Sequence, residues 1–403
     1  MKRFILMIVV LFFAMAVPLA QAGWTPVKRL TWSGGDGPSG GPSMPAIAVD
    51  SSDNLHLVWI NSKPGNWEIY YKKSEDGGAS WTSGQRLTWT SGSSEFPAIA
   101  VDSLNNLHVV WSDITPGNSV VYYKKSEDGG ATWTASQRIS WSSGYSLISA
   151  ITVDAYDNLH VVFWYQTTPG EANSEIYYRK STDGGSTWMT SQRLTWNSGY
   201  SFGPAIAVGA STLFYFSDDL HMVWADAVSG NYEIHYKNST DRGMTWQASQ
   251  RITWNSGSSM HPSIAVDSSD NLHVIWMDST PGKSDVFYKQ SADKGATWKT
   301  SKNLTRNATD SLNPALALDS SGDLHIVWVD SDAKGSLDIY YKKGLEGGVT
   351  WTANQRLTWN PWTNTTNSPD IAVDSFDNLH VVWPLHVFDL NCTEIYYKKY
   401  VKE

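Results

Sequence analysis

Apolar and polar positions alternate in short runs along the whole chain after about residue 23. In one stretch these runs are 98–101, 107–111, 121–125 and 133–141, and similar runs precede and follow them. They are rich in Val, Ile, Tyr and Trp and are bounded by Gly, Pro, Asn and Asp, which is typical of β-strands. No segment in this part shows a 3.6-residue apolar period, so we expect almost no helix.

The pattern Leu-His-x-Val-Trp returns at intervals of 52, 52, 61, 52, 52 and 55 residues. Each interval holds four strand-like runs, so the chain is divided into seven similar units. Seven units of four antiparallel strands predict an all-β fold, a seven-bladed β-propeller, over residues 23–403. The histidines that mark the units are His56, His108, His160, His221, His273, His325 and His380.

The two ends of the predicted propeller complement each other. The seventh unit stops after the third-strand run 394–399, and the segment Trp24–Trp32 matches the missing fourth strand. We therefore expect the N-terminal strand to complete the last blade and close the ring, which removes two exposed strand edges.

A second motif, Ser-x-Asp-x-Gly-x-x-Trp, lies between the third and fourth runs of most units. It begins at Ser74, Ser126, Ser181, Ser239 and Ser291, with a degenerate copy from Gly344. The Asp can accept hydrogen bonds from nearby amides while Gly takes positive φ, which is typical of a hairpin turn. The chain resembles the Asp-box, or BNR repeat, propellers of the sialidase superfamily. The structural Asp-box aspartates are Asp76, Asp128, Asp183, Asp241 and Asp293.

This resemblance implies a fold more firmly than an activity. Sialidases of the superfamily hold the substrate carboxylate with three arginines and carry an Arg-Ile-Pro motif near the start. Here six arginines belong to the repeat, Arg179 replaces a repeat lysine, Arg242 lies in an Asp-box and only Arg306 is off the pattern. No Arg-Ile-Pro string occurs, so the chain lacks a recognisable sialidase arginine triad.

The first 22 residues have the pattern of an export signal. Lys2 and Arg3 precede the apolar run 4–17, and Ala20-Gln21-Ala22 is a small-x-small cleavage site. We expect a protein that is secreted, periplasmic or displayed at the cell surface, with no membrane span after cleavage. Without the leader the chain has 28 basic and 39 acidic residues, a net charge of −11, which argues against nucleic acid as a partner. The single Cys392 excludes an internal disulfide, and no cofactor or metal site is predicted.

The seven units permit a comparison within one chain, because a residue present in every blade serves the blade whereas a reaction centre needs unlike groups that converge once. By this criterion the repeated histidines, the Asp-box aspartates and the arginines of Gln-Arg-Leu-Thr-Trp are structural. We expect each arginine to pair with the acid that opens the third strand, such as Glu68 or Glu175.

Tryptophans follow the same logic, since 20 of 22 are assigned to three repeat positions and Trp67 and Trp362 remain. Both belong to connections between strands two and three or four and one, on the face where propellers usually bind ligands. Aromatic rings there suit stacking on sugars. Other off-pattern candidates on this face are Tyr232, Glu95 and His261, and an acidic rim is formed by Asp113, Asp226, Asp278 and Asp330.

Blade 4 contains nine additional residues around Ser211–Phe216. By the order of the turns this insertion protrudes from the Asp-box side, and its aromatic residues indicate a contact for another protein.

Three functions are compatible with these features. The first is a non-catalytic binding module for a glycan or an extracellular protein, and the second is a glycoside hydrolase resembling seven-bladed xyloglucan-active enzymes. The second needs two carboxylates about 5–10 Å apart, for which Glu95, Glu171, Asp310 and Asp370 are the unpatterned candidates. The third is a structural module of the cell surface.

Overall fold

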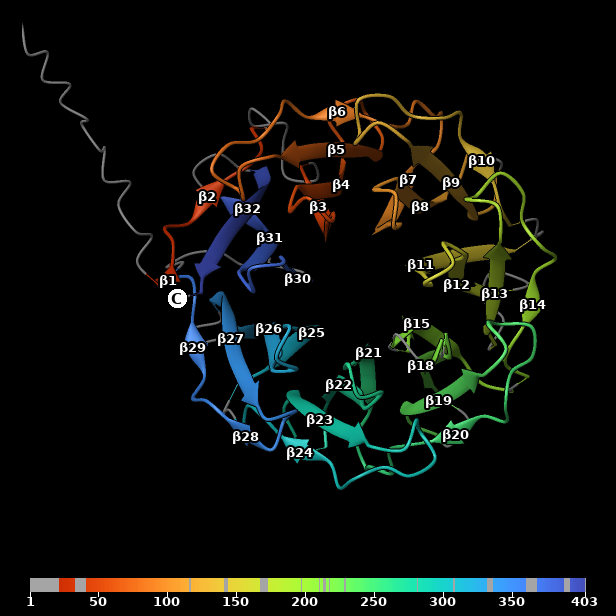
Figure 1. Ribbon diagram of the computed structural model, residues 1–403, viewed down its shortest axis with the longest axis vertical. Coiled ribbons are helices and arrows are strands. Elements are labelled where there is room, and N and C mark those ends of the chain that lie inside the picture. Colours follow the sequence, from red (N-terminus) through yellow and green to blue (C-terminus); the bar gives the residue numbers. More distant parts are fainter. Residues whose placement is uncertain are drawn as a thin grey trace, which may run out of the picture.

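The computed structural model places seven β-sheets as blades around a central axis, as the repeat predicts (Figure 1). None of the described residues is helical, and none forms a helix long and apolar enough to cross a membrane. The structure describes residues 22–32, 41–115, 117–140, 144–166, 173–196, 198–209, 211–212, 215–216, 218–227, 230–280, 282–306, 309–331, 336–359, 368–387 and 392–402.

Each blade is an antiparallel meander whose first strand lies nearest the axis and whose fourth strand lies at the outside (Figure 1). Blade 1 consists of β3 (Ser43–Val49), β4 (Leu55–Asn61), β5 (Glu68–Ser74) and β6 (Gln85–Arg86). Blade 2 consists of β7 (Ser94–Val101), β8 (Leu107–Asp113), β9 (Val120–Ser126) and β10 (Gln137–Arg138). Blade 3 consists of β11 (Tyr145–Val153), β12 (Leu159–Gln166), β13 (Glu175–Ser181) and β14 (Gln192–Arg193).

Blades 4 to 6 follow the same order with local additions. Blade 4 consists of β15 (Ser201–Val208), β18 (Leu220–Asp226), β19 (Glu233–Ser239) and β20 (Gln250–Arg251), with the extra hairpin β16 (Ser211–Thr212) and β17 (Tyr215–Phe216). Blade 5 consists of β21 (Ser259–Val266), β22 (Leu272–Asp278), β23 (Asp285–Ser291) and β24 (Lys302–Asn303). Blade 6 consists of β25 (Ser311–Leu318), β26 (Leu324–Ser331), β27 (Leu337–Leu345), β28 (Thr350–Trp351) and β29 (Gln355–Arg356).

Blade 7 combines the two ends of the chain. Its strands are β30 (Asp370–Val373), β31 (Leu379–Val387) and β32 (Cys392–Val401), and β1 (Gly23–Trp24) and β2 (Lys28–Arg29) pair with β32. The Trp24 ring lies edge-on to Tyr341 of blade 6 at 5.1 Å, the contact that an Asp-box tryptophan makes with a tyrosine at each of the other six blade junctions. The predicted closure by the N-terminal strand is confirmed.

The apolar cores lie between blades rather than within them. One cluster joins Val58 and Tyr71 of blade 1 to Val109 and Trp111 of blade 2, and comparable clusters occur at the other junctions. A single blade therefore cannot bury its own apolar surface, and stability depends on the closed ring.

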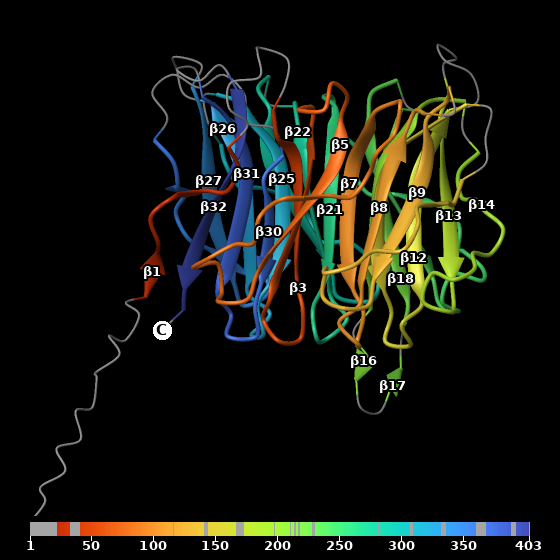
Figure 2. The ribbon, with the colours of Figure 1, turned by 90° about the horizontal axis from the view of Figure 1, so that it is seen from above.

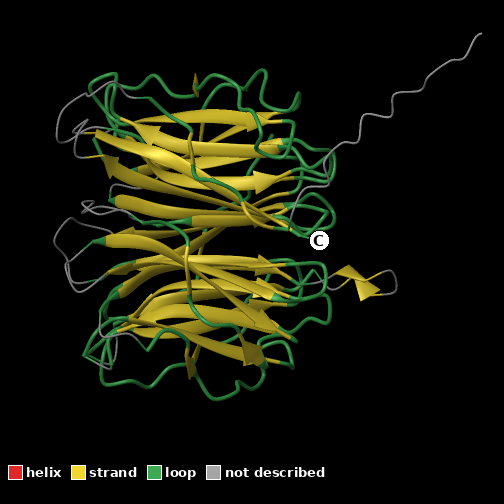
Figure 3. Ribbon diagram, turned by 90° about the vertical axis from the view of Figure 1, so that its left-hand side faces the viewer, coloured by secondary structure: helices red, strands yellow, loops and turns green. Residues whose placement is uncertain are grey.

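The connections divide the ring into two faces (Figure 2). The Asp-box face carries the turns from strand one to two and from three to four, and the loop face carries the connections from two to three and from four to one. The hairpin β16–β17 projects from the Asp-box face, as predicted (Figures 2 and 3). The side chains of 210–217 and the proposed leader up to residue 21 lie outside the described residues.

Candidate functional site

The Asp-box aspartates hold their own turns. The Asp76 carboxylate accepts hydrogen bonds from Ser80 N (2.7 Å), Ser80 Oγ (2.5 Å) and Ser74 Oγ (2.9 Å), while Ser74 Oγ accepts from Gly78 N (2.8 Å). The bonds from Ser80 lower the pKa of Asp76. Equivalent bonds hold Asp128, Asp183, Asp241 and Asp293, so the structural prediction for these residues is supported.

The repeated histidines connect neighbouring blades. In blade 2 the His108 imidazole lies between Asp102 (Nε2 to Oδ2, 3.1 Å) and Tyr123 (Nδ1 to Oη, 2.9 Å). The Tyr123 hydroxyl also donates to the Gly184 carbonyl of the blade 3 Asp-box at 3.2 Å. All seven histidines contact a tyrosine in this way, which confirms that they are structural groups and that each one has a partner.

Five arginines of the fourth strands pair as expected with the acids that open the third strands, whereas blade 2 opens its third strand with Val120 and so offers Arg138 no acid at this position. Arg86 Nη2 lies 2.8 Å from Glu68, and Arg193 Nη2 lies 2.5 Å from Glu175. Arg29, Arg251 and Arg356 make the same pair.

The acidic rim differs from the expectation. Asp113, Asp226, Asp278 and Asp330 are between 0% and 4% exposed, so they do not form a solvated rim on the loop face. Each accepts a hydrogen bond from the serine that opens the first strand of its own blade. Three of them also accept from the indole Nε1 of the buried second-strand tryptophan. The interpretation as a ligand-binding rim is corrected: these carboxylates tie the second strand to the first.

The tryptophan count also needs a correction in blade 3. Phe163, not Trp164, occupies the buried position of Trp111, because Phe163 stacks on Tyr177 as Trp111 stacks on Tyr122. Trp164 is one residue further along β12, where it is partly buried against blade 4. It is therefore a third tryptophan outside the repeat.

Two of the candidate ligand residues meet at the junction of blades 1 and 2. Trp67 is half-buried against the apolar cluster between the two blades, and its carbonyl accepts a hydrogen bond from Ser94 N (2.8 Å). Glu95, the residue after Ser94, is half-buried in β7. Its carboxyl has no hydrogen-bond partner among the described residues, and burial raises its pKa.

Two more candidates meet at the junction of blades 4 and 5. The Tyr232 ring packs edge-on against Phe202 at 4.9 Å, and Phe202 contacts His261 at 6.2 Å. His261 is open to solvent, yet the surrounding protein lowers its pKa by desolvation. It too has no hydrogen-bond partner among the described residues. Glu95 and His261 lie on the innermost strands of blades 2 and 5, on opposite sides of the axis (Figure 1).

One strained position of the repeat was not identified from the sequence. A β-bulge interrupts the first strand of six blades, and the residue before the proline at this level has φ between 49° and 61°. For a residue other than glycine this conformation costs about 1–2 kcal/mol. The side chain differs among the six blades that have this proline: Met44, Phe96, Gly203, His261, Asn313 and Ser368. The signal in the sequence is the variable residue directly before the proline that opens these six units, four of which read Ser-x-x-Pro.

The other unpatterned carboxylates are placed differently. Asp370 opens β30 and accepts hydrogen bonds from Ile47 N and Ile371 N, both 2.9 Å, while burial raises its pKa to about 6. Asp310 accepts from Ser284 N at 2.9 Å and is partly exposed on the loop face. Trp362 and Glu171 lie outside the described residues. Among the residues described, no group of three His, Cys, Asp or Glu could hold a metal ion.

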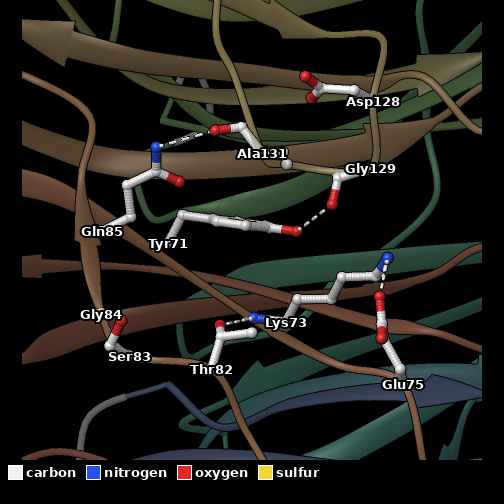
Figure 4. A pocket seen from close by; sticks show the side chains of 11 residues that line it. Tyr71, Lys73, Glu75, Thr82, Ser83, Gly84, Gln85, Asp128, Gly129 and Ala131 are labelled. Carbon is white, nitrogen blue, oxygen red and sulfur yellow. Dashed lines mark hydrogen bonds and ion pairs between the residues drawn. The ribbon is translucent and has the colours of Figure 1, made fainter.

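Two cavities open between blades near the Asp-box face. The first, about 510 Å³, is lined by Tyr71, Lys73 and Glu75 of blade 1 and by Asp128 and Gly129 of blade 2 (Figure 4). The second, about 400 Å³, lies between blades 6 and 7. The polar groups of the first are engaged with one another: Lys73 pairs with Glu75 at 2.8 Å, and Tyr71 donates to the Gly129 carbonyl at 3.1 Å. This cavity is therefore part of the joint between blades.

Residues 117–358, more than half of the chain, match the BNR repeat-like domain family. The chain belongs to this family. No curated protein sequence matches the BNR propeller described here.

Solved structures with the same fold include sialidases and related propellers. An ulvan lyase of a new polysaccharide lyase family aligns with a TM-score of 0.65 at 9% identity, over 91% of this chain and 95% of the lyase. The α-L-arabinofuranosidase of Fusarium graminearum aligns with a TM-score of 0.52 at 15% identity, over 75% and 92%. A Hadza microbial sialidase aligns with a TM-score of 0.50 at 16% identity, over 72% and 63%. At these identities the likeness to each structure shows the fold alone.

Proposed function

We propose that this BNR propeller is an exported glycan-binding protein that holds its ligand around the axis on the loop face and does not cleave it. The observation that carries the proposal is the state of Glu95 and His261. Both are ionisable groups partly surrounded by protein, and neither has a hydrogen-bond partner among the described residues. Each of the seven repeat histidines has a tyrosine partner, whereas ionisable groups without such a partner are typical of a binding site.

The aromatic residues beside these groups favour a sugar. Trp67 adjoins Glu95 through the Ser94 backbone, and Tyr232 approaches His261 through Phe202. Aromatic faces next to polar groups suit the apolar faces and hydroxyls of pyranose rings. The structural neighbours that act on polysaccharides and glycosides support this class of ligand, although an extracellular protein is the alternative ligand. Export rests on the leader pattern of residues 1–22.

Asp370 favours a second candidate function, glycoside hydrolysis. Its raised pKa, about 6, and the raised pKa of Glu95 are properties of carboxyls that serve as general acids. Non-catalytic binding is preferred because the Asp370 carboxylate is engaged by two backbone amides, Ile371 N of its own strand and Ile47 N across the junction of blades 7 and 1.

A glycan array followed by calorimetry on the best glycan tests the first proposal. We expect Glu95→Gln to weaken binding at least tenfold and His261→Ala to do the same. Glu127→Gln is the matched control, since Glu127 is exposed on the Asp-box face beside Lys125. Binding that persists unchanged in both loop-face variants would contradict the assignment.

Reducing-end release from the same glycans tests the alternative. The proposal predicts no turnover by the wild type. Turnover that is lost in both Asp370→Asn and Glu95→Gln would establish the hydrolase instead.

A further inference from the structure

The outer wall of the ring carries large apolar side chains that are exposed to solvent. Among the described residues, the tryptophans that end the Gln-Arg-Leu-Thr-Trp runs are between 65% and 69% exposed, whereas the second-strand tryptophans, such as Trp111, are almost fully buried. We call the exposed residues the wall tryptophans: Trp32, Trp89, Trp196, Trp254 and Trp359.

Each wall tryptophan lies at a junction between two blades. The guanidinium of Arg86, from the same blade, lies 5.5 Å from the centre of the Trp89 ring, and Lys124 Nζ, from the next blade, lies 5.9 Å away. The same pair of cations approaches the other four rings at 5.5–6.0 Å. Lys124 is held inward by its bond to the Leu87 carbonyl at 2.6 Å, so the ring remains widely open to solvent.

The arginine beside each ring has a hydrogen bond to give. Arg86 uses Nε for the Thr88 carbonyl (2.6 Å) and Nη2 for Glu68 (2.8 Å), and Nη1 has no partner among the described residues. Its side chain is 24% exposed. Every wall tryptophan therefore has beside it a fixed guanidinium whose Nη1 is left over, and its N–H groups can donate to a hydroxyl or carboxylate of a molecule stacked on the ring.

The distribution of these sites restricts the ligand. The fourth strands lie around the outside of the ring (Figure 1), so a flat membrane or one globular partner could touch only a fraction of the five. The indoles are also separated from one another by whole blades, which does not make the continuous apolar patch of a protein interface. Equivalent sites that recur on five blades around the ring fit a ligand that itself repeats.

We propose that the wall tryptophans are equivalent stacking sites for the pyranose rings of one repeating polysaccharide, with the neighbouring arginine Nη1 donating to a sugar oxygen. This binding uses different residues from the loop-face site proposed above, although it shares the class of ligand. A single stacked sugar binds weakly, but several sites on one polymer raise the overall affinity by 10²–10⁴.

Blade 5 provides a matched control. Its run reads Asn303-Leu304-Thr305-Arg306, so an arginine stands at the wall position and an asparagine replaces the repeat arginine. Arg306→Ala should therefore leave polysaccharide binding unchanged.

Affinity electrophoresis of the full chain in gels containing xyloglucan or polygalacturonate, together with calorimetry on their di- and trisaccharides, tests the proposal. We expect at least one polymer to retard the wild type, and short oligosaccharides to bind at least 100-fold more weakly. Trp89→Ala/Trp254→Ala should weaken retardation at least tenfold, and Trp89→Phe/Trp254→Phe should keep part of it. The midpoint of thermal unfolding reports whether these variants remain folded.

Two results would overturn the proposal: no retardation of the wild type by either polymer, or equal retardation of wild type and a folded double alanine variant. Trp67→Ala and Glu95→Gln separate the two sites. If these variants lose array binding while the wall variants do not, the loop-face function stands and the wall proposal fails. The reverse pattern supports the wall sites and contradicts the loop-face proposal.

Discussion

The two faces of the ring use the same repeat in opposite ways. On the Asp-box face, aspartate, histidine and tyrosine recur in nearly the same arrangement from blade to blade, and Tyr123 reaches the carbonyl of Gly184 in the next blade. On the loop face, the strained position of the first strand, present in six blades, holds a different residue in each of them, among them Phe96 and His261. Residues that recur from blade to blade therefore join neighbouring blades, and residues that vary lie on the face where unlike groups converge.

Exposure refines this distinction. A recurring residue serves the blade when it is buried or bonded, as Trp111 and His108 are. A recurring residue that stays exposed, as Trp89 does, has no such role. Substitutions at buried residues of the joints should therefore have the largest effects on stability.

Trp111→Ala should lower the free energy of unfolding by about 4 kcal/mol, because a large indole is removed from a packed interblade core. Trp89→Ala, at the same junction of blades 1 and 2, should change the free energy of unfolding by less than about 0.5 kcal/mol, because Trp89 is 69% exposed. Urea denaturation measures both values. Similar losses in the two variants would show that the wall tryptophans are structural.

Gly130→Ala should lower the free energy of unfolding by about 3 kcal/mol more than Gly117→Ala. Both glycines have φ near +91°, so their backbone strain is matched. A Cβ on Gly130 would lie 2.1 Å from Tyr71 Oη, whereas nothing lies within 4 Å of one on Gly117. Equal destabilisation in urea would mean that the contact between Tyr71 and the Asp-box turn is not close-packed.

Because of His221, the free energy of unfolding should fall by about 2 kcal/mol as the pH is lowered from 7 to 5. Burial lowers its pKa from 6.5 to about 4, and blade 4 has no aspartate at its Nε2. The unfolded chain then binds the proton more tightly, so stability is complete above pH 6.5 and is lost as the pH falls toward 4. His221→Gln should flatten this part of the curve of unfolding free energy against pH, and an unchanged slope would contradict the buried neutral state.

Tyr123→Phe should lower the free energy of unfolding by about 1–2 kcal/mol, because His108 and the Gly184 carbonyl both lose the hydroxyl. Tyr145→Phe, at the half-buried start of β11, serves as the comparison for removal of a tyrosine hydroxyl outside the joints. Indistinguishable unfolding curves for the two variants would show that the Tyr123 hydroxyl does not stabilise the junction between blades.

The architecture followed from the sequence because its determinants are periodic. The spacing of Leu-His-x-Val-Trp counted the blades, and the match of Trp24–Trp32 to a missing fourth strand located the closure, which the pairing of Trp24 with Tyr400 confirms. The pairs of Arg86 with Glu68 and of Arg193 with Glu175 were also predictable, since opposite charges recur at fixed separations.

Only part of the candidate site could be predicted from the sequence, because the site depends on contacts between blades. Asp113 and its equivalents were expected on the surface, but the direction of a side chain at the end of a strand is set by the serine and indole partners that it meets. The contact of Phe202 with His261 joins two units that are separate in the sequence. Trp164 was assigned to the repeat because it directly follows Phe163, the residue that occupies the repeat position in β12.

Hydrogen exchange with and without the best glycan from the array shows directly whether the ligand binds on the loop face, because it reports on both faces in one experiment. The loop-face site predicts protection in segments 94–98 and 259–263, around Glu95 and His261, with little change in the Asp-box turns such as 126–133. Protection confined to the Asp-box turns would contradict it.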